Sequence, residues 1–238
     1  MHIGLLRHIL FIDIETVPEK ESYEELDQET KVFWDKKAQM LSYGKTNLED
    51  DNLYDRAGIY AEFGKIICIS VGYIVPKKDK WEVRIKSFYG YNEKELLKQI
   101  IPLFDKEFGF THLCAHNGKE FDFPYLCRRM IKHGIQLPRI LNISGLKPWE
   151  ISHFDTLEMW KFGDYKHYTS LALLAHMFGI EDSKSDMDGS MVSKVYYKEG
   201  NLEKIAEYCN KDVYTLIRVF LHMKQVKTPE NTEYVFLK

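Results

Sequence analysis

The sequence has no uninterrupted apolar run of the kind that crosses a membrane. The first apolar stretch, residues 9–14, is broken by Asp13, whereas a membrane span needs about 18 or more apolar residues. The opening MHIGLLRHIL has neither a long apolar core nor a small-residue cleavage site, so it does not resemble a signal peptide. These absences exclude a membrane-spanning protein. We therefore expect a soluble protein of the cytoplasm with no membrane partner.

Two further features are missing, namely metal-binding cysteine pairs and a general basic surface. The four cysteines, at 68, 114, 127 and 209, occur singly, without CxxC or Cys/His ligand spacing, and we expect them to be buried free thiols. Lysine and arginine number 33 against 36 aspartates and glutamates, which gives a formal net charge of -3. Many nucleic-acid-binding proteins are instead basic overall. A nucleic-acid partner of this chain must therefore be held locally or through metal ions.

The sequence does contain enough apolar material for one sizeable core. Of its 238 residues, 45% are hydrophobic and 14% are aromatic, which suits a single α/β domain. No internal repeat, low-complexity tract or linker divides the chain, so we interpret residues 1–238 as one domain. The segment at about 19–63 is rich in charged residues and tyrosine, and we interpret it as an insertion with a helix-like patch near 54–63.

The hydrophobic pattern predicts a mixed sheet covered by helices. Short apolar, β-branched runs predict strands at 9–15, 65–75, 81–88, 111–115 and 151–154, of which the second and third form a hairpin. Helical spacing of apolar residues predicts helices over 92–104, 123–133, 156–160, 170–178 and 201–224, with Pro102 kinking or shortening the first. A hairpin followed by alternating helices and strands is typical of an α/β fold.

Two acids interrupt the first predicted strand. Asp13 and Glu15 are two residues apart, so both side chains point to one face, roughly 6 to 7 Å apart, and both can reach one cation. Burying two like charges without a cation would be costly. The alternative is a strand end in solvent with two ordinary surface acids. Asp-x-Glu also occurs at 27–29 and 105–107, but there the surroundings are charged, and a solvated surface is the simplest interpretation.

Two other polar groups lie beside apolar segments. Asn117 and Asp122 follow the predicted strand 111–115, and Asp122 is either a site residue or the N-cap of the next helix. In the last predicted helix, Tyr208 and Asp212 are four residues apart and share one face at the edge of the apolar stripe. Asp212 is therefore either an acid turned toward the protein body or an ordinary acid at the boundary of that stripe.

In this order along the chain, the three polar segments resemble the motifs of the DEDD family of 3′-5′ exonucleases. FIDIET at 11–16 resembles the first motif, HNGKEFDFPYL at 116–126 the second, and YCNKD at 208–212 the third. A tyrosine four residues before the last acid is the mark of the DEDDy branch. The segments AEFGKIICIS, FDTL and SLALL are similar to stand-alone exonucleases related to the proofreading domain of family B DNA polymerases. The resemblance covers nearly the whole chain.

This resemblance implies a ribonuclease H-like fold, an α/β fold with a mixed sheet of about five strands and helices on both faces. It implies that Asp13, Glu15 and Asp212 hold one divalent cation, Mg²⁺ or Mn²⁺, and that Asp13 and Asp122 help to hold a second. Two such ions can stabilise the attacking and leaving oxygens of a displacement at phosphorus. The implied catalytic residues are these four acids together with Tyr208, which would orient the attacking water.

The resemblance also implies that Asn117 and the backbone near Thr16 contact the terminal nucleotide. The expected activity is a metal-dependent 3′-5′ exonuclease that releases nucleoside 5′-monophosphates from single-stranded 3′ ends. We expect DNA rather than RNA, because the nearest resemblance is to DNA proofreading domains. The alternatives are an exoribonuclease, a catalytically silent nucleic-acid-binding module of the same fold, and a hydrolase of nucleotides or other small phosphoesters. The intact set of four acids argues against the silent module.

Four further groups have both a functional and a structural interpretation. His116 is a phosphate contact or a strand-end histidine bonded to backbone, and Asp155 is a fifth metal ligand or an N-cap. For both we favour the structural interpretation. The basic residues within 128–133 either steer a nucleic-acid strand or form a solvated helix face. The aromatic residues within 165–168 are either stacking surfaces or part of the core.

Overall fold

A six-stranded mixed sheet forms the centre of the computed structural model, which describes residues 3–42, 53–77, 80–104, 108–164, 168–180 and 187–237. The strand order is β5-β4-β1-β2-β3-β6. The strands are β1 Ile9–Pro18, β2 Gly64–Pro76, β3 Trp81–Tyr89, β4 His112–Ala115, β5 Phe154–Asp155 and β6 Glu233–Leu237. The pairs β1–β2 and β2–β3 are antiparallel, and the other pairs are parallel. The predicted α/β class and the predicted hairpin are confirmed.

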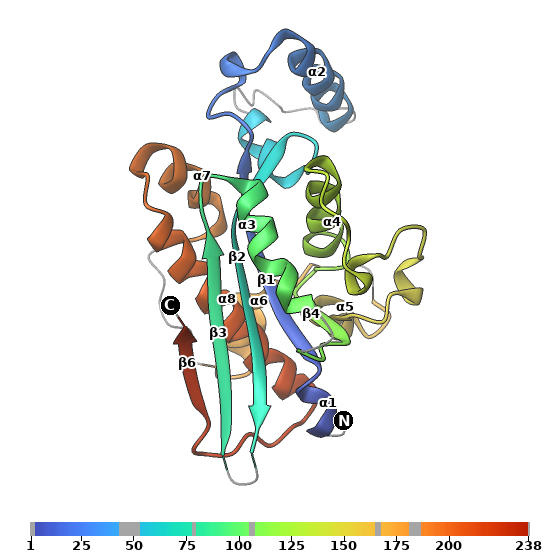
Figure 1. Cartoon of the computed structure of the whole chain (residues 1–238), viewed down its shortest axis with the longest axis vertical. Helices are drawn as coiled ribbons and strands as arrows, with labels where there is room; N and C mark the ends of the chain where they lie inside the picture. The colour runs from blue at the N-terminus through green and yellow to red at the C-terminus, as the bar shows by residue number, and fades with distance from the viewer. Residues whose placement is uncertain are drawn as a thin grey trace.

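Helices cover both faces of the sheet (Figure 1). The α-helices are α1 Ile3–Leu6, α2 Gln28–Ser42, α3 Glu93–Ile100, α4 Asp122–Lys132, α5 Thr156–Lys161, α6 Leu171–Met177, α7 Val192–Lys194 and α8 Leu202–Met223. Shorter helical turns are η1 Tyr23–Glu25, η2 Leu53–Ile59, η3 Ile101–Phe104, η4 Arg139–Leu141, η5 Pro148–Glu150, η6 Gly189–Met191 and η7 Val195–Glu199. α3 and α4 pack on one face, and α8 packs along β1, β2 and β3 on the other.

Alternation along β1 separates the two layers of the core. Ile12 and Ile14 belong to the core shared with α3 and α4, whereas Val17 packs with side chains of α8. Since successive side chains of a strand point to opposite faces, Asp13 and Glu15 fall in the row that faces α8. The two acids therefore occupy positions that would otherwise be apolar core.

The starts of α3 and α8 and the end of α3 lie where the sequence predicts them. The side chains of Asn92 and Asn201 accept backbone N–H bonds in the first turns of α3 and α8, at 3.3 and 3.0 Å. α3 ends at Ile100, and the 3-10 turn that follows contains Pro102, as predicted. The predicted strand at 151–154 is shorter and later, because only the two residues of β5 pair with β4.

The sixth strand differs from the expected count of about five. β6 pairs in parallel with β3, with Glu233 opposite Glu82 and Leu237 opposite Lys86. None of its side chains is buried. A short edge strand with exposed side chains lacks the continuous apolar run by which a central strand is recognised, so the sequence pattern did not indicate it.

Residues 19–63 contain a helix, α2, that the sequence pattern did not predict. Its one buried side chain, Trp34, packs edge-on against Tyr54 and Phe63, with ring centroids 5.4 and 5.1 Å away. A helix with a single buried residue has no apolar stripe to reveal it. The helix-like patch predicted near 54–63 is the 3-10 turn η2. Figure 1 shows α2 beyond the end of the sheet, as a small projection from the body.

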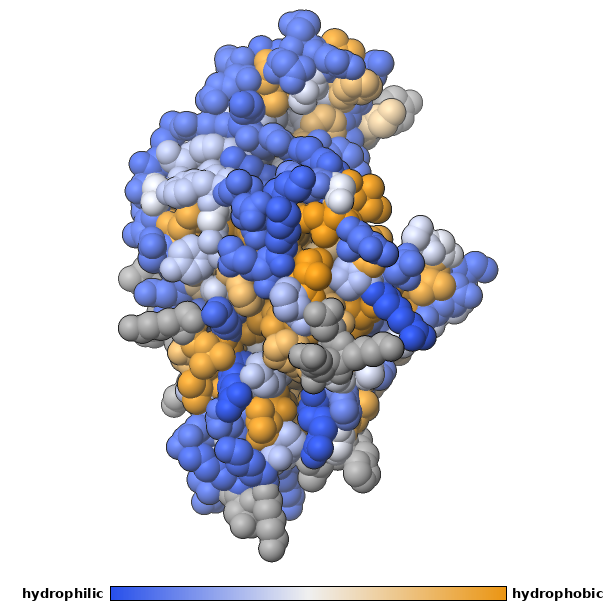
Figure 2. All heavy atoms as spheres, viewed as in Figure 1, coloured by the Kyte–Doolittle hydropathy of each residue, from blue (hydrophilic) through white to orange (hydrophobic). Residues whose placement is uncertain are grey.

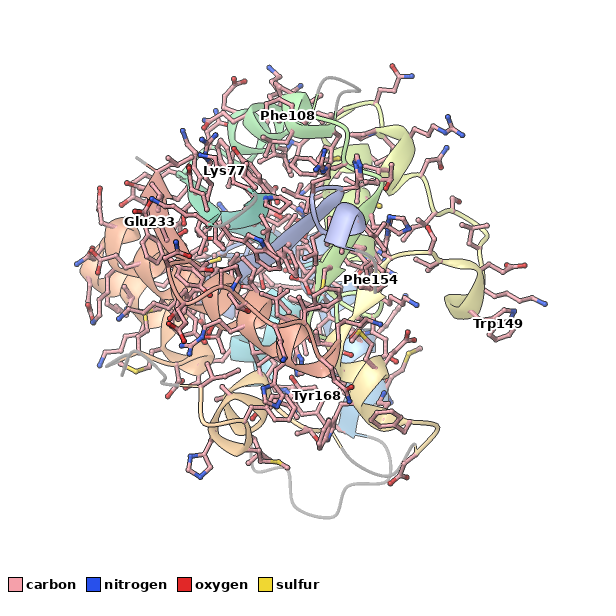
Figure 3. All side chains as sticks on the ribbon, turned by 90° about the horizontal axis from the view of Figure 1, so that it is seen from below. Lys77, Phe108, Trp149, Phe154, Tyr168 and Glu233 are labelled. Atoms are coloured by element: carbon pink, nitrogen blue, oxygen red, sulfur yellow. The ribbon has the colours of Figure 1, made fainter. Side chains whose placement is uncertain are left out.

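One of the other two Asp-x-Glu pairs can be compared with the structure. Asp27 is exposed, and its carboxylate accepts the backbone N–H of Thr30 at 2.9 Å, so the Asp-x-Glu pair at 27–29 is on the surface as predicted. The pair at 105–107 lies outside the described residues. Trp149 is 77% exposed and stands at the end of a loop away from the body (Figure 3).

The structure also bears on the predictions for the cysteines and for membrane spans. All four cysteines are buried free thiols, as predicted. In the described ranges, no helix has both the length and the apolar character that a bilayer span requires. The cysteines therefore contribute to packing, and one of them, Cys209, also lies beside the candidate site.

Candidate active site

The two acids of β1 lie inside the sheet at an irregular position. Asp13 pairs with Ser70 of β2 and Glu15 pairs with Cys68, and the register shifts between Glu15 and Thr16. A bulge of this kind bends the strand and re-aims side chains, and bulges are common next to active sites. Glu15 is only 9% exposed. The alternative of a strand end in solvent is therefore wrong.

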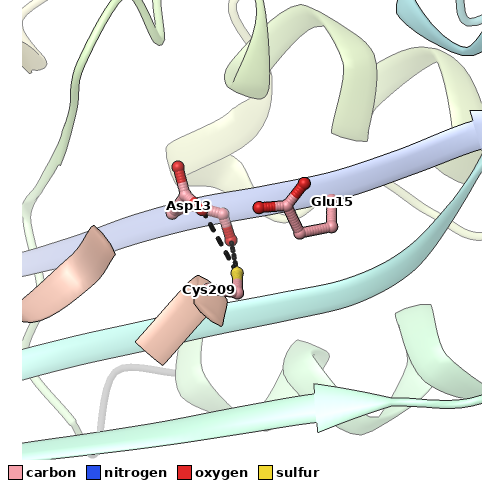
Figure 4. A group of neighbouring side chains, drawn as sticks. All are labelled: Asp13, Glu15 and Cys209. Carbon is pink, nitrogen blue, oxygen red and sulfur yellow. Dashed lines mark hydrogen bonds between the residues drawn. The ribbon is translucent and has the colours of Figure 1, made fainter. Parts of the chain in front are cut away.

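Cys209 of α8 forms a compact group with these acids. One ligand atom from each of Asp13, Glu15 and Cys209 lies within 4.8 Å of the others. The Cys209 thiol donates to Asp13 Oδ2 at 3.2 Å, and Figure 4 shows the three side chains meeting between β1 and α8. The sequence predicts a buried thiol here but not this contact. Its only signal was the position of Cys209 directly after Tyr208 in the third motif.

Asp122 reaches the same strand from the opposite layer. It is the first residue of α4, is 3% exposed, and its Oδ1 accepts the backbone N–H of Ile14 at 3.2 Å. The N-cap position belongs to Phe121, so the interpretation of Asp122 as an N-cap is wrong. The carboxylate is used at β1, where the charge of Asp122 acts on Asp13.

The remaining acid, Asp212, comes from α8. Its charge acts on both Asp13 and Glu15. The hydroxyl of Tyr208, one turn earlier, hydrogen-bonds the Asp212 carboxylate. The structure thus brings together the four predicted acids and the predicted tyrosine from β1, α4 and α8. Of the two interpretations of Asp212, the structure supports an acid turned toward the protein body over an ordinary acid at the boundary of the apolar stripe.

Burial and mutual repulsion change the proton affinity of this group. Burial is the largest cause that raises the pKa of Asp13, and the charges of Asp212 and Asp122 add to it. Burial, followed by the charge of Asp13, also raises the pKa of Glu15 well above its usual value. Burial raises the pKa of Asp122 to about 7. Like charges held this close favour a bound proton or a bound cation.

The donor set fits a divalent metal ion. In the part of the chain that the structure describes, no lysine or arginine forms an ion pair with Asp13, Glu15 or Asp122. Carboxylate oxygens are the ligands that Mg²⁺ and Mn²⁺ prefer. The site therefore has oxygen donors and excess negative charge, and both suit such an ion.

The environment of Tyr208 disfavours loss of its phenol proton. Burial, followed by the charges of Asp212 and Glu15, raises its pKa well above the usual value for a phenol. The hydroxyl therefore keeps its proton at neutral pH. A protonated phenol can position a water molecule, but it cannot act as a general base.

The two predicted substrate contacts occupy fixed backbone positions. Thr16 follows the register shift in β1, and its hydroxyl hydrogen-bonds that of Tyr125 in α4. Asn117 has a left-handed backbone with φ of 64°, a conformation that asparagine tolerates better than most residues. Next to it, a Cβ on Gly118 would lie 2.3 Å from the Cβ of Ala115. Only glycine therefore fits in this tight loop before α4.

Asp155 holds this loop in place. It is 2% exposed and accepts the backbone N–H groups of Asn117 and Lys119, both at 3.0 Å. It also accepts the N–H groups of Leu157 and Glu158 in the first turn of α5, at 2.9 and 3.3 Å. The favoured interpretation as an N-cap is confirmed. With four N–H donors on its two oxygens, Asp155 is a positioning residue and not a free ligand.

His116 and Tyr168 lie beside this loop. The His116 ring nitrogens contact the Thr156 hydroxyl and the Thr169 carbonyl, both at 2.9 Å, so the structural interpretation of His116 is supported. Tyr168 is 67% exposed, with its ring centroid 6.2 Å from that of His116 (Figure 3). It is therefore not a core residue, and its role as a stacking surface remains a prediction. Tyr165 and His167 lie outside the described residues.

Two cations of the predicted basic segment, Arg129 and Lys132, form ion pairs with acids of the chain. Arg129 is 1% exposed and contacts Glu93 at 2.5 Å. The His133 ring lies 2.6 Å from the same carboxylate, and Lys132 contacts Glu19 at 2.6 Å. Both interpretations of this segment are therefore wrong for Arg129, since it neither faces solvent nor is free to meet a nucleic-acid strand.

Residues 59–235 match a family described as a predicted 3′-5′ exonuclease related to the exonuclease domain of PolB. The match covers well over half of the chain. It includes the second and third motifs, with Asp122, Tyr208 and Asp212. Asp13 and Glu15 precede the matched range.

The curated relatives are much longer proteins. A DNA polymerase of Pyrococcus horikoshii is 29% identical over 148 residues, which are 56% of this chain and 12% of the polymerase. A DNA polymerase of Thermococcus litoralis is 25% identical over 189 residues, which are 68% of this chain and 11% of the polymerase. The chain thus spans about a tenth of the length of the relatives it matches.

A solved structure shows the same fold. The family B DNA polymerase from the hyperthermophilic archaeon Pyrobaculum calidifontis matches 90% of this chain and 24% of its own, with a TM-score of 0.55 and 14% identity. The ribonuclease H-like fold is confirmed by this likeness. By the match over residues 59–235, the chain belongs to the family of 3′-5′ exonucleases related to the exonuclease domain of PolB.

Proposed function

We propose that this chain is a metal-dependent 3′-5′ exonuclease of the DEDDy type, which removes nucleoside 5′-monophosphates from single-stranded 3′ ends. The observation that carries the proposal is the meeting of four acids from β1, α4 and α8 at one place. Three of them, Asp13, Glu15 and Asp122, have no lysine or arginine ion pair within the described ranges. Their charge therefore calls for cations from outside the chain.

Each residue of the site has a separate task. Asp13, Glu15 and Asp212 would hold one Mg²⁺ or Mn²⁺ ion, and Asp13 and Asp122 would help to hold a second. Such ions, when bound, lower the pKa of an attacking water and stabilise the leaving oxygen. The Tyr208 hydroxyl, bonded to Asp212 and protonated at neutral pH, orients that water.

The terminal nucleotide would meet two backbone segments beside the acids. Asn117 would contact it from the loop that Asp155 holds by two N–H bonds. The backbone near Thr16 would contact it from β1, directly after the register shift. A rigid backbone favours catalysis, because the scissile phosphate must be held close to its productive geometry.

We propose DNA as the substrate rather than RNA. The curated relatives are DNA polymerases, and the family is named after the exonuclease domain of PolB. The preference for DNA rests on these relatives. The alternatives, an exoribonuclease and a catalytically silent binding module, remain outcomes of the test.

The test uses matched single strands of DNA and RNA, labelled at the 5′ end, with Mg²⁺ or Mn²⁺. The expected result is a ladder of DNA products that shorten one nucleotide at a time, release of nucleoside 5′-monophosphates, and arrest by EDTA. A single internal cut, or activity that EDTA does not reduce, contradicts the proposal. Faster shortening of RNA indicates an exoribonuclease. Binding without hydrolysis indicates a silent module, and hydrolysis of mononucleotides alone indicates a small-phosphoester hydrolase.

A further inference from the structure

A hollow of about 370 Å³ lies outside the candidate active site, where β1 ends and where β2 and α3 begin. We call it the lysine hollow, after three of its lining residues, Lys20, Lys65 and Lys94. Tyr91 also lines it, as do two acids. None of the four acids of the candidate active site does. In Figure 2, hydrophilic side chains gather over the first turns of α3, beside this position.

The two acids of the lysine hollow are already neutralised. Glu93 contacts Arg129 at 2.5 Å and the ring of His133 at 2.6 Å. Glu19 contacts Lys132 at 2.6 Å. Arg129 and Lys132 belong to α4, so both carboxylates are balanced from the side of the protein body.

The three lysines of the hollow are not balanced in this way. Within the described ranges, no carboxylate lies at ion-pair distance from Lys20, Lys65 or Lys94, and Glu19 and Glu93 act on Lys65 only at longer range. The Lys65 ammonium lies 4.8 and 5.2 Å from the ring centroids of Tyr196 and Tyr197. Burial lowers the pKa of Lys65. An anion in the hollow would stabilise this half-buried charge.

An exposed aromatic ring stands at the same hollow. Tyr91 is 63% exposed, yet its hydroxyl donates to the Gly200 carbonyl at 3.1 Å and its ring lies 5.5 Å from that of Tyr196. Its ring is therefore held in place while one side stays accessible. Cationic side chains beside a fixed aromatic surface are the combination by which proteins bind single-stranded nucleic acid.

We propose that the lysine hollow binds phosphodiester groups of a single strand upstream of its 3′ end, with Tyr91 stacking on a base. The proposal deepens the proposed function and rests on it. Asp13 and Glu19 are six residues apart on or next to β1, which corresponds to about 20 Å at about 3.3 Å per residue. The terminal nucleotide at the acids cannot also fill the hollow. The hollow would therefore hold an earlier part of the same strand and offset the repulsion from an acidic protein.

The test is equilibrium binding of a fluorescent DNA strand of about 16 nucleotides, and of one of about 4 nucleotides, lengths that span known single-strand site sizes. Binding is measured in EDTA, so that no hydrolysis occurs. The variant is Lys20→Gln/Lys94→Gln, at two exposed lysines of the hollow. The matched control is Lys36→Gln/Lys227→Gln, which changes the net charge equally at exposed positions that do not line the hollow.

The hollow variant should bind the longer strand about tenfold more weakly at low salt, because two phosphate contacts are lost. The slope of log K against log salt should become shallower by about 1.4, at about 0.7 per contact on a single strand. Binding of the short strand, and all binding by the control variant, should stay within about twofold of wild type. An equal loss in both variants, an unchanged salt slope, or no wild-type binding overturns the proposal.

Free inorganic phosphate has the same chemistry and must be distinguished from the strand. Tyr91→Leu should weaken binding of the longer strand about fivefold or more, because base stacking is lost. If phosphate raises the wild-type Tm but not that of Lys20→Gln/Lys94→Gln, while strand binding is equal in both, the hollow serves free phosphate and the proposal is wrong. Binding through the hollow without hydrolysis in Mg²⁺ would contradict the proposed function alone. Hydrolysis whose KM for the longer strand is the same in the lysine variant would contradict the hollow alone.

Discussion

Two groups of buried carboxylates in this molecule have opposite electrostatics. Glu93, 6% exposed at the start of α3, accepts from Arg129 and from the backbone N–H of Ile66 at 2.7 Å. Burial alone would raise the pKa of Glu93, but these bonds outweigh it and hold the pKa below its usual value. For Asp13 and Glu15, burial and neighbouring acids act in the same direction, and their pKa values are raised.

The difference distinguishes an acid that is paired with a cation of the chain from acids that repel one another. A buried acid with its counter-ion in the chain stabilises the fold only as a pair, whereas an acid without one needs a cation from outside. The helix α4 contributes to both groups. Asp122 at its start reaches β1, and Arg129, seven residues later, reaches Glu93. Variants of the two groups should therefore fail in different ways.

The largest expected effect is on activity at the four acids of the candidate active site. Asp212→Ala should lower the single-turnover rate by about 10³-fold or more at saturating Mg²⁺, because a lost metal ligand removes both water activation and charge stabilisation. Asp27→Ala, at an exposed acid outside the site, serves as the control and should stay within about twofold of wild type. An Asp212→Ala rate near that of the control would show that Asp212 holds no catalytic ion.

Variants of the ion pair between Glu93 and Arg129 should lower the stability of the fold instead. Arg129→Ala leaves Glu93 buried without its cation, and the free energy of unfolding should fall by about 3–5 kcal/mol, measured by urea denaturation. The double variant Arg129→Met/Glu93→Gln should recover part of this loss, since it removes the unpaired charge as well. A loss below about 1 kcal/mol for Arg129→Ala, the range of an exposed pair, would mean that the ion pair is solvated and that the comparison fails.

Tyr208 tests a smaller part of the candidate active site. Tyr208→Phe keeps the ring and deletes only the hydroxyl that bonds Asp212. The single-turnover rate should fall about 10²-fold, as for the loss of one positioning group, with substrate binding little changed. A rate within about twofold of wild type would remove Tyr208 from the mechanism and, with it, the DEDDy assignment.

The smallest expected effect is on the pH dependence of stability. Asp122 and Glu93 should change the stability in opposite directions as the pH rises. The pKa of Asp122 rises from 3.8 to about 7 on folding. The contribution of Asp122 to the free energy of unfolding is therefore fully present below about pH 4 and is lost as the pH rises through 7. The Tm in EDTA should be lower at pH 8 than at pH 5, and Mn²⁺ should reduce this difference. Glu93, with a lowered pKa, has the opposite sign and loses its contribution only as the pH falls through its lowered pKa.

The variant Asp13→Asn tests the repulsion among the acids of the candidate active site. Asp13→Asn should raise the Tm in EDTA at pH 8 by about 2–4 °C, because one repelling charge is gone, which corresponds to about 1 kcal/mol. It should also flatten the rise of Tm with Mn²⁺. An equal rise with Mn²⁺ in wild type and Asp13→Asn would place the ion at another part of the molecule.

The local features of this protein were predictable from the sequence because they depend on neighbouring residues. The caps at Asn92 and Asn201 bond to groups three residues away, and the end of α3 depends on the nearby Pro102. Likewise, the pairs Asp13/Glu15 and Tyr208/Asp212 share a face through strand and helix geometry alone. The order and spacing of these motifs were enough to predict the residues of the candidate site, whose catalytic roles stay predictions.

Contacts between distant segments were decided only by the tertiary structure. Cys209 lies against Asp13 across 196 positions of sequence, and Arg129 is buried against Glu93 across 36. No local pattern distinguishes Arg129 from the exposed basic residues beside it, since a buried ion pair becomes visible only when both helices are in place. The edge strand β6 has no buried side chain, so its sequence lacks the apolar run of a central strand, and only its pairing with β3 reveals it. Local chemistry therefore determined which acids form the candidate site, whereas the path of the chain decided which of the described acids, such as Glu93, lie against a cation of the chain.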